Sequence, residues 1–422
     1  MDRARILFGH LNSEHKEETG LELKTASHQI SADDIVVVSA KRTPICKAKR
    51  GSFKDTFIDD LLAAAFDGVL KDVNIDPKMI GDICVGNVSQ PGVGALMARM
   101  AQFYVGIPET VPLSTVNRQC SSGLQAFMNI AGAIRNGQCE IGLAGGAEHM
   151  TSTGTGMGAM SELNPKVGEF DLARACLTPM GITSENVAER YGVTRAVQDQ
   201  MAMESHAKAA KAYKLGYYKD EIIPVTTSIK DKEGNEKTIT VDKDDGIREG
   251  TTLEVLGKLR AVFKPDGSTT AGNSSQTSDG AAAVLVAKRS AAAKHKLPIL
   301  GVLRGFAVVG VDPEVMGIGP AEAIPVALKN AGVTLNDIDI FEINEAFASQ
   351  ASYCRDKLGI PNEKLNPKGG AIAIGHPLGC SGARMIATLL HELKRRGKRG
   401  YGVVSMCIGT GMGAAAVFEY TG

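Results

Sequence analysis

Short runs of β-branched and apolar residues alternate along this chain with longer stretches in which apolar residues recur at helical spacing. In the first part of the chain, residues 35–38, 82–88 and 140–144 form such runs, and residues 57–73 and 121–135 carry the pattern of amphipathic helices. Strands that alternate with helices of this length are typical of an α/β fold with a buried sheet.

The same rhythm returns late in the chain. Strands are predicted over residues 281–287, 337–343 and 401–406, and helices over residues 321–330 and 379–396. Residues of the two stretches match at an almost constant offset: Leu70-Lys71 with Leu328-Lys329, Asp82-Ile83 with Asp339-Ile340, Asn87 with Asn344, and Cys120 with His376. We therefore predict an internal duplication, with two similar α/β halves whose mixed sheets pack against each other across helices.

The duplication leaves residues from about 150 to 277 without a counterpart. We predict four parts: an N-terminal segment (1–34), an N-terminal half (35–149), an inserted loop domain (150–277) and a C-terminal half (278–422). Within the insertion, residues 197–215 are predicted to be helical and the charged residues 230–243 to form a hairpin. The insertion is either a surface decoration or a clamp for a ligand.

Charge and cysteine spacing narrow the classes of function. Lysine and arginine total 47, as do aspartate and glutamate, so the net charge of zero argues against general nucleic-acid binding. No apolar run reaches the roughly 18–20 residues that a membrane-spanning helix needs. None of the eight cysteines falls in a C-x-x-C pair. We expect free thiols, with neither a zinc site nor a disulfide framework.

Each duplicated unit places a reactive residue just before a helix. Cys120 precedes the first such helix, where the helix dipole and free N–H groups favour the thiolate, and His376 holds the matching place in the second half. A lone buried cysteine or histidine is more often an ordinary core residue. Their equivalent positions instead favour a nucleophile and its base brought together at a pseudo-twofold axis.

Cys407 is a third candidate for chemistry. It ends a predicted strand and is followed by Gly409, Gly411 and Gly413, which allow the backbone to approach a ligand and aim an N–H group at a developing oxyanion. A dinucleotide-binding fingerprint would need a helix after these glycines. Residues 414–420 are predicted to form a terminal strand, so we reject that interpretation.

Asn344 and Glu345 follow another predicted strand. The amide of Asn344 could fix a water molecule or donate to a carbonyl oxygen, whereas Glu345 is as readily explained as a charge on the first helical turn.

These segments resemble the signature blocks of the thiolase family. The four blocks are Asn117-Arg118-Gln119-Cys120-Ser121-Ser122-Gly123, Asn344-Glu345-Ala346-Phe347-Ala348, Gly375-His376-Pro377-Leu378-Gly379 and Cys407-Ile408-Gly409-Thr410-Gly411. The resemblance runs from about Asp34 to the C-terminus and is strongest to the peroxisomal members that act on 3-ketoacyl-CoA. It implies an acyltransferase of fatty-acid β-oxidation, with no permanently bound cofactor and no metal.

The resemblance also implies roles for individual residues. Cys120, deprotonated by His376, would attack the 3-keto carbonyl, and Cys407 would exchange protons with the acetyl-CoA enolate and coenzyme A. His376 and a water held by Asn344 would stabilise the enolate, and the N–H groups of Cys120 and Gly409 the tetrahedral intermediate. In the loop domain, coenzyme A would contact Arg248 at its nucleotide end and Ser275 at its pantetheine arm. The residues of the acyl and pantetheine tunnel would be Met180, Met316 and Phe347.

Two segments depart from the family pattern. His149, within Glu148-His149-Met150, stands where the family usually has serine, and we expect it to be structural. Arg3-Ala4, followed after five residues by His10-Leu11, resembles an amino-terminal peroxisomal targeting signal with an unusual second position. We expect a peroxisomal protein, recognised by an import receptor, ahead of a mitochondrial or cytosolic one. Family members suggest a homodimer.

Two other functions remain open. One is an acetoacetyl-CoA thiolase working in the condensing direction, although Pro179 stands where short-chain enzymes usually have histidine, which favours longer acyl chains. The other is a non-catalytic carrier of acyl-CoA or lipid, which would have no need to keep the reactive thiols.

Overall fold

The computed structural model describes residues 28–154 and 163–422. Its main feature is a ten-stranded mixed sheet in the order β10-β11-β12-β9-β1-β8-β5-β3-β4, with β2 (Cys46–Lys47) paired to β8. One set of neighbouring strands is β1 (Ile35–Arg42), β8 (Ser278–Lys288), β5 (Ile141–His149), β3 (Asp82–Gly86) and β4 (Leu113–Val116). The other set is β9 (Gly301–Gly310), β12 (Met412–Tyr420), β11 (Gly400–Ile408) and β10 (Ile338–Ile343).

The two sets of strands have the same order and the same directions. β1, β8 and β5 are successively antiparallel and β5, β3 and β4 parallel, just as β9, β12 and β11 are antiparallel and β11 and β10 parallel. In the place of β4, the second set has one parallel bridge between Phe341 and Leu365. This topology supports the duplication that the sequence predicts.

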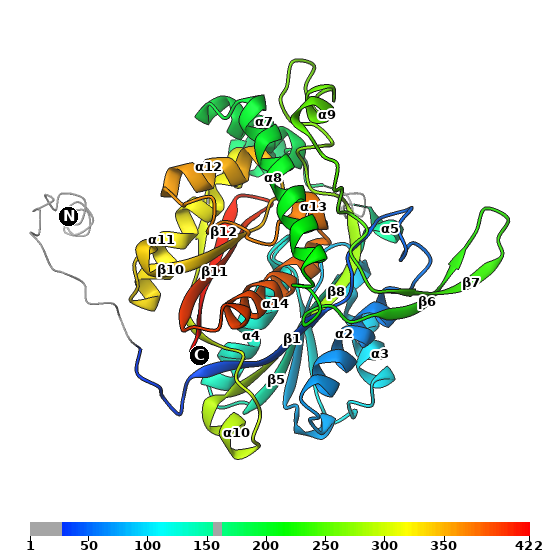
Figure 1. Ribbon diagram of the computed structural model, residues 1–422, viewed down its shortest axis with the longest axis vertical. Coiled ribbons are helices and arrows are strands. Elements are labelled where there is room, and N and C mark those ends of the chain that lie inside the picture. Colours follow the sequence, from blue (N-terminus) through cyan, green and yellow to red (C-terminus); the bar gives the residue numbers. More distant parts are fainter. Residues whose placement is uncertain (1–27, 155–162) are drawn as a thin grey trace, which may run out of the picture.

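The helices also occupy equivalent places. α4 (Ser122–Arg135) and α14 (Leu378–Arg396) share one apolar cluster with strands of both sets, and they lie between them (Figure 1). α2 (Ile58–Asp72) covers the outer face of the first set, and α11 (Gly319–Ala331) that of the second. The predicted packing of two sheets across helices is therefore confirmed, and the expected α/β class with it.

One connection between the halves is additional to that prediction. β1 and β9 pair through Val36 with Val302 and Val37 with Gly301, so the edges of the two sets are hydrogen-bonded to each other. β8, which follows the inserted segment, pairs with β5 and β1 and therefore lies in the first set. This pairing favours a second half that begins after β8 rather than at residue 278.

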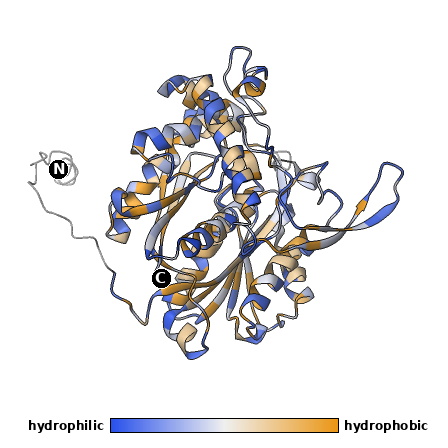
Figure 2. Ribbon diagram, viewed as in Figure 1, coloured by the Kyte–Doolittle hydropathy of each residue, from blue (hydrophilic) through white to orange (hydrophobic). Residues whose placement is uncertain are grey.

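The sequence explains the individual elements in simple terms. α2 buries one face that includes Leu61, Leu62 and Phe66, and it carries two acidic residues in its first turn, where the helix dipole favours negative charge. The central strands β5 and β11 are buried along their whole length and largely apolar, because helices cover both faces (Figure 2).

The segment between β5 and β8 combines helices, a hairpin and long loops. Its described helices are α5 (Met150–Thr153), α6 (Asp171–Ala175), α7 (Met180–Tyr191), α8 (Arg195–Lys214) and α9 (Leu253–Gly257). The predicted helix over residues 197–215 corresponds to α8, and the predicted hairpin to β6 (Val225–Lys230) and β7 (Glu236–Val241), which project from the body (Figure 1). The remaining helices are α3 (Ala95–Tyr104), α10 (Arg289–Lys294), α12 (Ala348–Leu358) and α13 (Ala371–Ile374).

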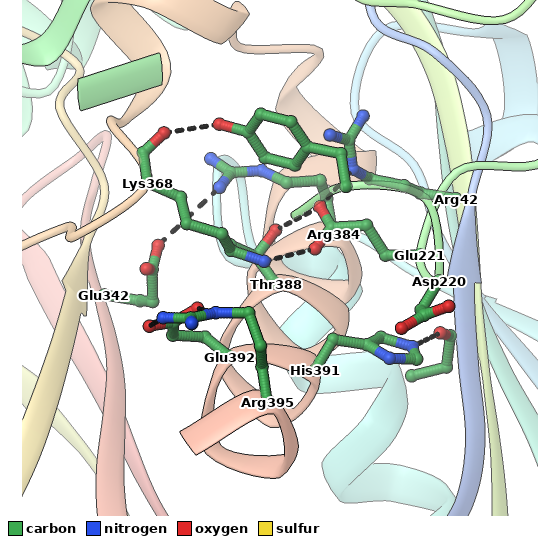
Figure 3. A network of polar contacts seen from close by, with 12 residues as sticks. Arg42, Asp220, Glu221, Glu342, Lys368, Arg384, Thr388, His391, Glu392 and Arg395 are labelled. Atoms are coloured by element: carbon green, nitrogen blue, oxygen red, sulfur yellow. Dashed lines mark hydrogen bonds and ion pairs between the residues drawn. The ribbon is translucent and has the colours of Figure 1, made fainter. Parts of the chain in front are cut away.

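A buried ionic group attaches this segment to both halves, and Figure 3 shows the part of it around Arg42, Glu221 and Lys368. Arg42 of β1 binds Asp244 at 2.7 Å and Glu221 at 2.8 Å, and Lys368 binds Glu221 at 2.6 Å. All four side chains are buried. Two cations balance two carboxylates here, which is the condition under which buried charge is tolerated.

Candidate active site

Cys120 and His376 occupy equivalent places in the two halves. Each lies two residues before the first residue of a central helix, Cys120 before α4 and His376 before α14. The two helix starts touch without intervening side chains: a Cβ on Gly382 would lie 2.3 Å from the backbone nitrogen of Leu124. Glycine at this contact allows the two reactive residues, far apart in the sequence, to lie at neighbouring helix ends.

Cys120 is half-buried, and its sulfur faces backbone donors. Burial raises the pKa of the Cys120 thiol to about 11, while the N–H groups of Gly409 and of Cys120 itself oppose this shift by bonding to the sulfur. The preceding residue, Gln119, has a left-handed φ of 48°. The resting thiol is therefore protonated at neutral pH and needs a base before it can attack.

His376 is a neutral base in this setting. Burial, with the positive charge of Arg384, lowers the pKa of His376 to about 3. Its Nδ1 lies 2.6 Å from the Ser381 hydroxyl oxygen, and its Nε2 lies 3.3 Å from the amide nitrogen of Asn344. A direct hydrogen bond between Cys120 and His376 is not among those formed within residues 28–154 and 163–422. Such contacts often tighten only when substrate binds.

Asn344 and Cys407 come from adjacent strands of the second half. The backbone N–H of Asn344, directly after β10, donates to Ser405 of β11, two residues before Cys407. The side-chain oxygen of Asn344 is buried without a partner among the described residues. Burial, with the charge of Cys120, raises the pKa of Cys407 well above its ordinary value. A Cβ on Gly409, two residues after Cys407, would lie 3.8 Å from Cγ of Gln119, so the segments that carry the two cysteines are neighbours.

The three predicted tunnel residues lie around Cys407. Met316 and Cys407 belong to one small apolar cluster with Ala346, and Met180 and Phe347 pack against it. The backbone N–H of Ser275 donates to Ala346 at 3.0 Å, so Ser275 lies beside the same cluster. The structure thus brings these four residues together next to Cys407.

Arg248 lies apart from the sulfurs, in the inserted segment. Its side chain is exposed, and its backbone N–H donates to Nδ1 of His206 at 3.2 Å. Burial lowers the pKa of His206 to about 4, and the charges of Arg248 and Lys47 contribute to this shift. Arg248 therefore belongs to a positively charged region that also includes Lys47.

Sequence reasoning missed the part played by Glu148. This buried carboxylate at the end of β5 accepts hydrogen bonds from the backbone N–H groups of Val88, Ser89 and Gly379 at 3.1, 2.9 and 2.8 Å. Burial raises the pKa of Glu148, and its charge acts in turn on Cys120. A carboxylate at the end of an apolar, glycine-rich strand was the signal in the sequence.

His149 is held by structural bonds, and no described contact joins it to the sulfurs. Its ring nitrogens contact the hydroxyl oxygen of Ser152 and the carbonyl oxygen of Phe53, each at 3.1 Å.

The targeting pattern from Arg3 to Leu11 lies outside the described residues. Within the described ranges, none of the helices combines the length and apolar character that crossing a membrane requires.

An α/β duplication with a cysteine, a neutral histidine and a second cysteine around one site defines a class of thiol-dependent acyl-transfer enzymes. Two family models match the chain: "Thiolase, N-terminal domain" over residues 35–290 and "Thiolase, C-terminal domain" over residues 297–420. The chain therefore belongs to the thiolase family.

Individual relatives are similar over the whole length. The chain is 62% identical to "3-ketoacyl-CoA thiolase A, peroxisomal" of Mus musculus, with 100% of each chain covered, and 61% identical to the peroxisomal 3-ketoacyl-CoA thiolase of Homo sapiens, again with 100% of each covered.

Solved structures share the fold. The dimeric peroxisomal thiolase of Saccharomyces cerevisiae superposes with a TM-score of 0.86 at 47% identity, covering 92% of this chain and 98% of that one. Human mitochondrial 3-ketoacyl-CoA thiolase in complex with CoA superposes with a TM-score of 0.82 at 39% identity, covering 94% and 100%.

Proposed function

We propose that the protein cleaves 3-ketoacyl-CoA with coenzyme A to give acetyl-CoA and an acyl-CoA shortened by two carbons. This is the closing step of fatty-acid β-oxidation. The observation that carries the proposal is the contact between the starts of α4 and α14, which follow Cys120 and His376, with Gly409, two residues after Cys407, beside Gln119. Full-length similarity to relatives named 3-ketoacyl-CoA thiolase supports the substrate class.

In the first half-reaction, His376 takes the proton of the Cys120 thiol, and the thiolate attacks the 3-keto carbon. The bond between C2 and C3 then breaks, and its electrons form the enolate of acetyl-CoA. The thiol of Cys407 protonates C2, so acetyl-CoA leaves and the shortened acyl group stays on Cys120 as a thioester.

In the second half-reaction, the Cys407 thiolate takes the proton of incoming coenzyme A. The resulting thiolate attacks the acyl carbonyl, the bond to Cys120 breaks, and Cys120 recovers its proton from His376. The raised pKa of Cys407 suits the second half-reaction, because such a thiolate accepts the proton of coenzyme A readily.

Negative charge develops on two different oxygens in this sequence, so two sets of donors are needed. The N–H groups of Gly409 and Cys120 already face the Cys120 sulfur, where the tetrahedral intermediate would form. His376 and Asn344 lie 3.3 Å apart and would serve the enolate oxygen, with a water held by the amide.

Coenzyme A would run from the sulfurs to Arg248. Ser275 would contact its pantetheine arm, and Met180, Met316 and Phe347 would line the tunnel next to Cys407. Arg248, beside Lys47, would meet the anionic nucleotide end. The relative solved in complex with CoA supports coenzyme A as the ligand, and the inserted loop domain, residues 150–277, would be the clamp.

We further propose that the protein is peroxisomal and a homodimer. The peroxisomal names of the relatives and the dimeric yeast thiolase support these assignments. The segment from Arg3 to Leu11 would be read by an import receptor.

Thiolysis measured across acyl lengths tests the substrate class. We expect turnover of medium- and long-chain 3-ketoacyl-CoA. Turnover of the four-carbon substrate alone would favour the acetoacetyl-CoA thiolase alternative, and binding without turnover at any length would favour the carrier.

A further inference from the structure

The ring of His376 is held from both sides within a buried site. Nδ1 lies 2.6 Å from the Ser381 hydroxyl oxygen, one turn into α14, and Nε2 lies 3.3 Å from the amide nitrogen of Asn344. His376 is only 5% exposed and Ser381 is fully buried. Bulk water is therefore not available to replace either partner.

The Ser381 hydroxyl has a second partner, which leaves its oxygen free to accept a hydrogen bond from His376. Its proton is donated to the carbonyl oxygen of Pro377 at 3.1 Å. A hydroxyl has one proton and accepts with its remaining lone pairs, so Ser381 can accept from an N–H at Nδ1. The Asn344 amide, a donor, faces Nε2. Both contacts agree with a ring that carries its proton on Nδ1 and none on Nε2.

We infer that Ser381 is a positioning residue, which fixes the tautomer of His376 so that the Nε2 lone pair is the one offered to the Cys120 proton. The inference rests on the proposed function, in which His376 is the base. A neutral imidazole without such a partner distributes its proton between the two nitrogens and turns about its side-chain bond. Either change withdraws the basic nitrogen from the thiol.

Ser381 has no contact of its own with the sulfurs among the described hydrogen bonds. Its effect passes through His376, much as a partner behind a metal-bound histidine affects the metal. Loss of such a partner typically costs about 10–100-fold in activity. We expect a loss of that size in kcat, with little change in KM, because Ser381 does not line the proposed coenzyme tunnel.

The test uses the full-length protein with Ser381→Ala, Ser381→Thr and the control Ser349→Ala. Ser349 is also buried, and its hydroxyl bonds to Ser184 at 2.7 Å, so the control also removes a buried, hydrogen-bonded hydroxyl. Thiolysis gives kcat and KM. Nitrogen-15 spectra of histidine-labelled protein, with His376 assigned by comparison with His376→Gln, report which ring nitrogen is protonated.

We expect the parent and Ser349→Ala to show His376 protonated at Nδ1, Ser381→Ala to show a mixture with kcat reduced about 10–100-fold, and Ser381→Thr to recover most of both. An unchanged His376 spectrum in Ser381→Ala, or equal loss in the Ala and Thr variants, would overturn the inference. A parent that forms Nδ1–H His376 but cleaves no 3-ketoacyl-CoA would instead contradict the proposed function alone.

Discussion

The backbone N–H of Gly379, in the first turn of α14, donates to the carboxylate of Glu148 at the end of β5 at 2.8 Å. This bond joins the helix that follows His376 to a strand of the other half. Glu148 also binds Val88 and Ser89, so one carboxylate holds three backbone segments around the start of α14. The relative placement of His376 and Cys120 therefore depends on contacts across the duplication, and not on α4 and α14 separately.

The close approach of α4 and α14 predicts a large effect of one methyl group. A Cβ on Gly382 would lie 2.3 Å from the backbone nitrogen of Leu124, so Gly382→Ala must push the two helices apart. We expect a cost of about 1–3 kcal/mol in the free energy of unfolding, and a fall in thiolysis of more than tenfold in the protein that remains folded.

Gly132→Ala provides the matched control on α4. No atom lies within 4 Å of a Cβ at Gly132, so we expect a gain of about 0.5–1 kcal/mol and unchanged thiolysis. Urea unfolding and steady-state thiolysis measure both quantities. Full activity in Gly382→Ala would show that the helix contact does not position the reactive pair.

The buried ionic group predicts that Lys368→Met destabilises the fold. The change leaves Glu221 and Asp244 opposite Arg42 alone, with one uncompensated buried charge. Breaking such a pair costs about 3–5 kcal/mol, which urea unfolding would measure. Adding Glu221→Gln restores the charge balance, so the double variant should be more stable than Lys368→Met.

An exposed ion pair serves as the comparison for Lys368→Met. Lys258 and Glu254 form an i,i+4 pair at 2.6 Å with both side chains largely exposed. Lys258→Met should change the free energy of unfolding by no more than about 0.5 kcal/mol. Equal effects of the two lysine substitutions would contradict the role of burial.

The buried histidine predicts how stability depends on pH. Burial, with the charge of Arg384, lowers the pKa of His376 to about 3, whereas its ordinary value is 6.5. Between these values the unfolded chain binds a proton that the native protein does not. The free energy of unfolding must therefore fall as the pH drops below about 6.5, by up to about 1.4 kcal/mol per pH unit from this group.

His376→Gln removes this contribution. Urea unfolding near pH 7 and near pH 5 should show a smaller acid-side loss in the variant than in the parent. Equal losses in the two proteins would mean that His376 is protonated in the native state, and so is not the neutral base.

The roles of Cys120 and Cys407 are expected to be separable by substitution. Cys407→Ser should abolish exchange of the C2 protons of acetyl-CoA with deuterated water, because a serine hydroxyl is too weak an acid to donate the proton. Transfer of an acyl group from acyl-CoA to Cys120 should persist. Mass spectrometry follows both reactions, and retained exchange in Cys407→Ser would assign the proton transfer to another group.

The sequence predicted the elements of this fold well because their periods are local. The helix predicted over residues 379–396 is α14 (Leu378–Arg396), and the strand predicted over residues 414–420 is β12 (Met412–Tyr420). Strand partners were harder to predict, since alternation and apolar runs do not say which edge a strand joins. The pairing of β1 with β9, and of β8 with the first set, depends on contacts remote in the sequence.

The candidate site also divides into residues that the local sequence predicts and residues whose roles depend on remote contacts. Cys120, His376 and Cys407 could be chosen from their places before helices and after a strand. Glu148 and Ser381 could not, because their importance lies in the atoms that they contact: the Gly379 N–H across the duplication and the Nδ1 of His376. The packing of α14 against the first half determines which atoms these two residues contact, and residue type alone does not reveal it.

The central claim is that Cys120 carries the acyl group and that His376 generates its thiolate. Peptide mapping by mass spectrometry, after mixing with a medium-chain 3-ketoacyl-CoA in the absence of coenzyme A, tests it directly. We predict a mass increase of one shortened acyl group on the peptide containing Cys120 in the parent, none in Cys120→Ser, and slow formation in His376→Gln. An acyl group on another residue, or no adduct in the parent, would contradict it.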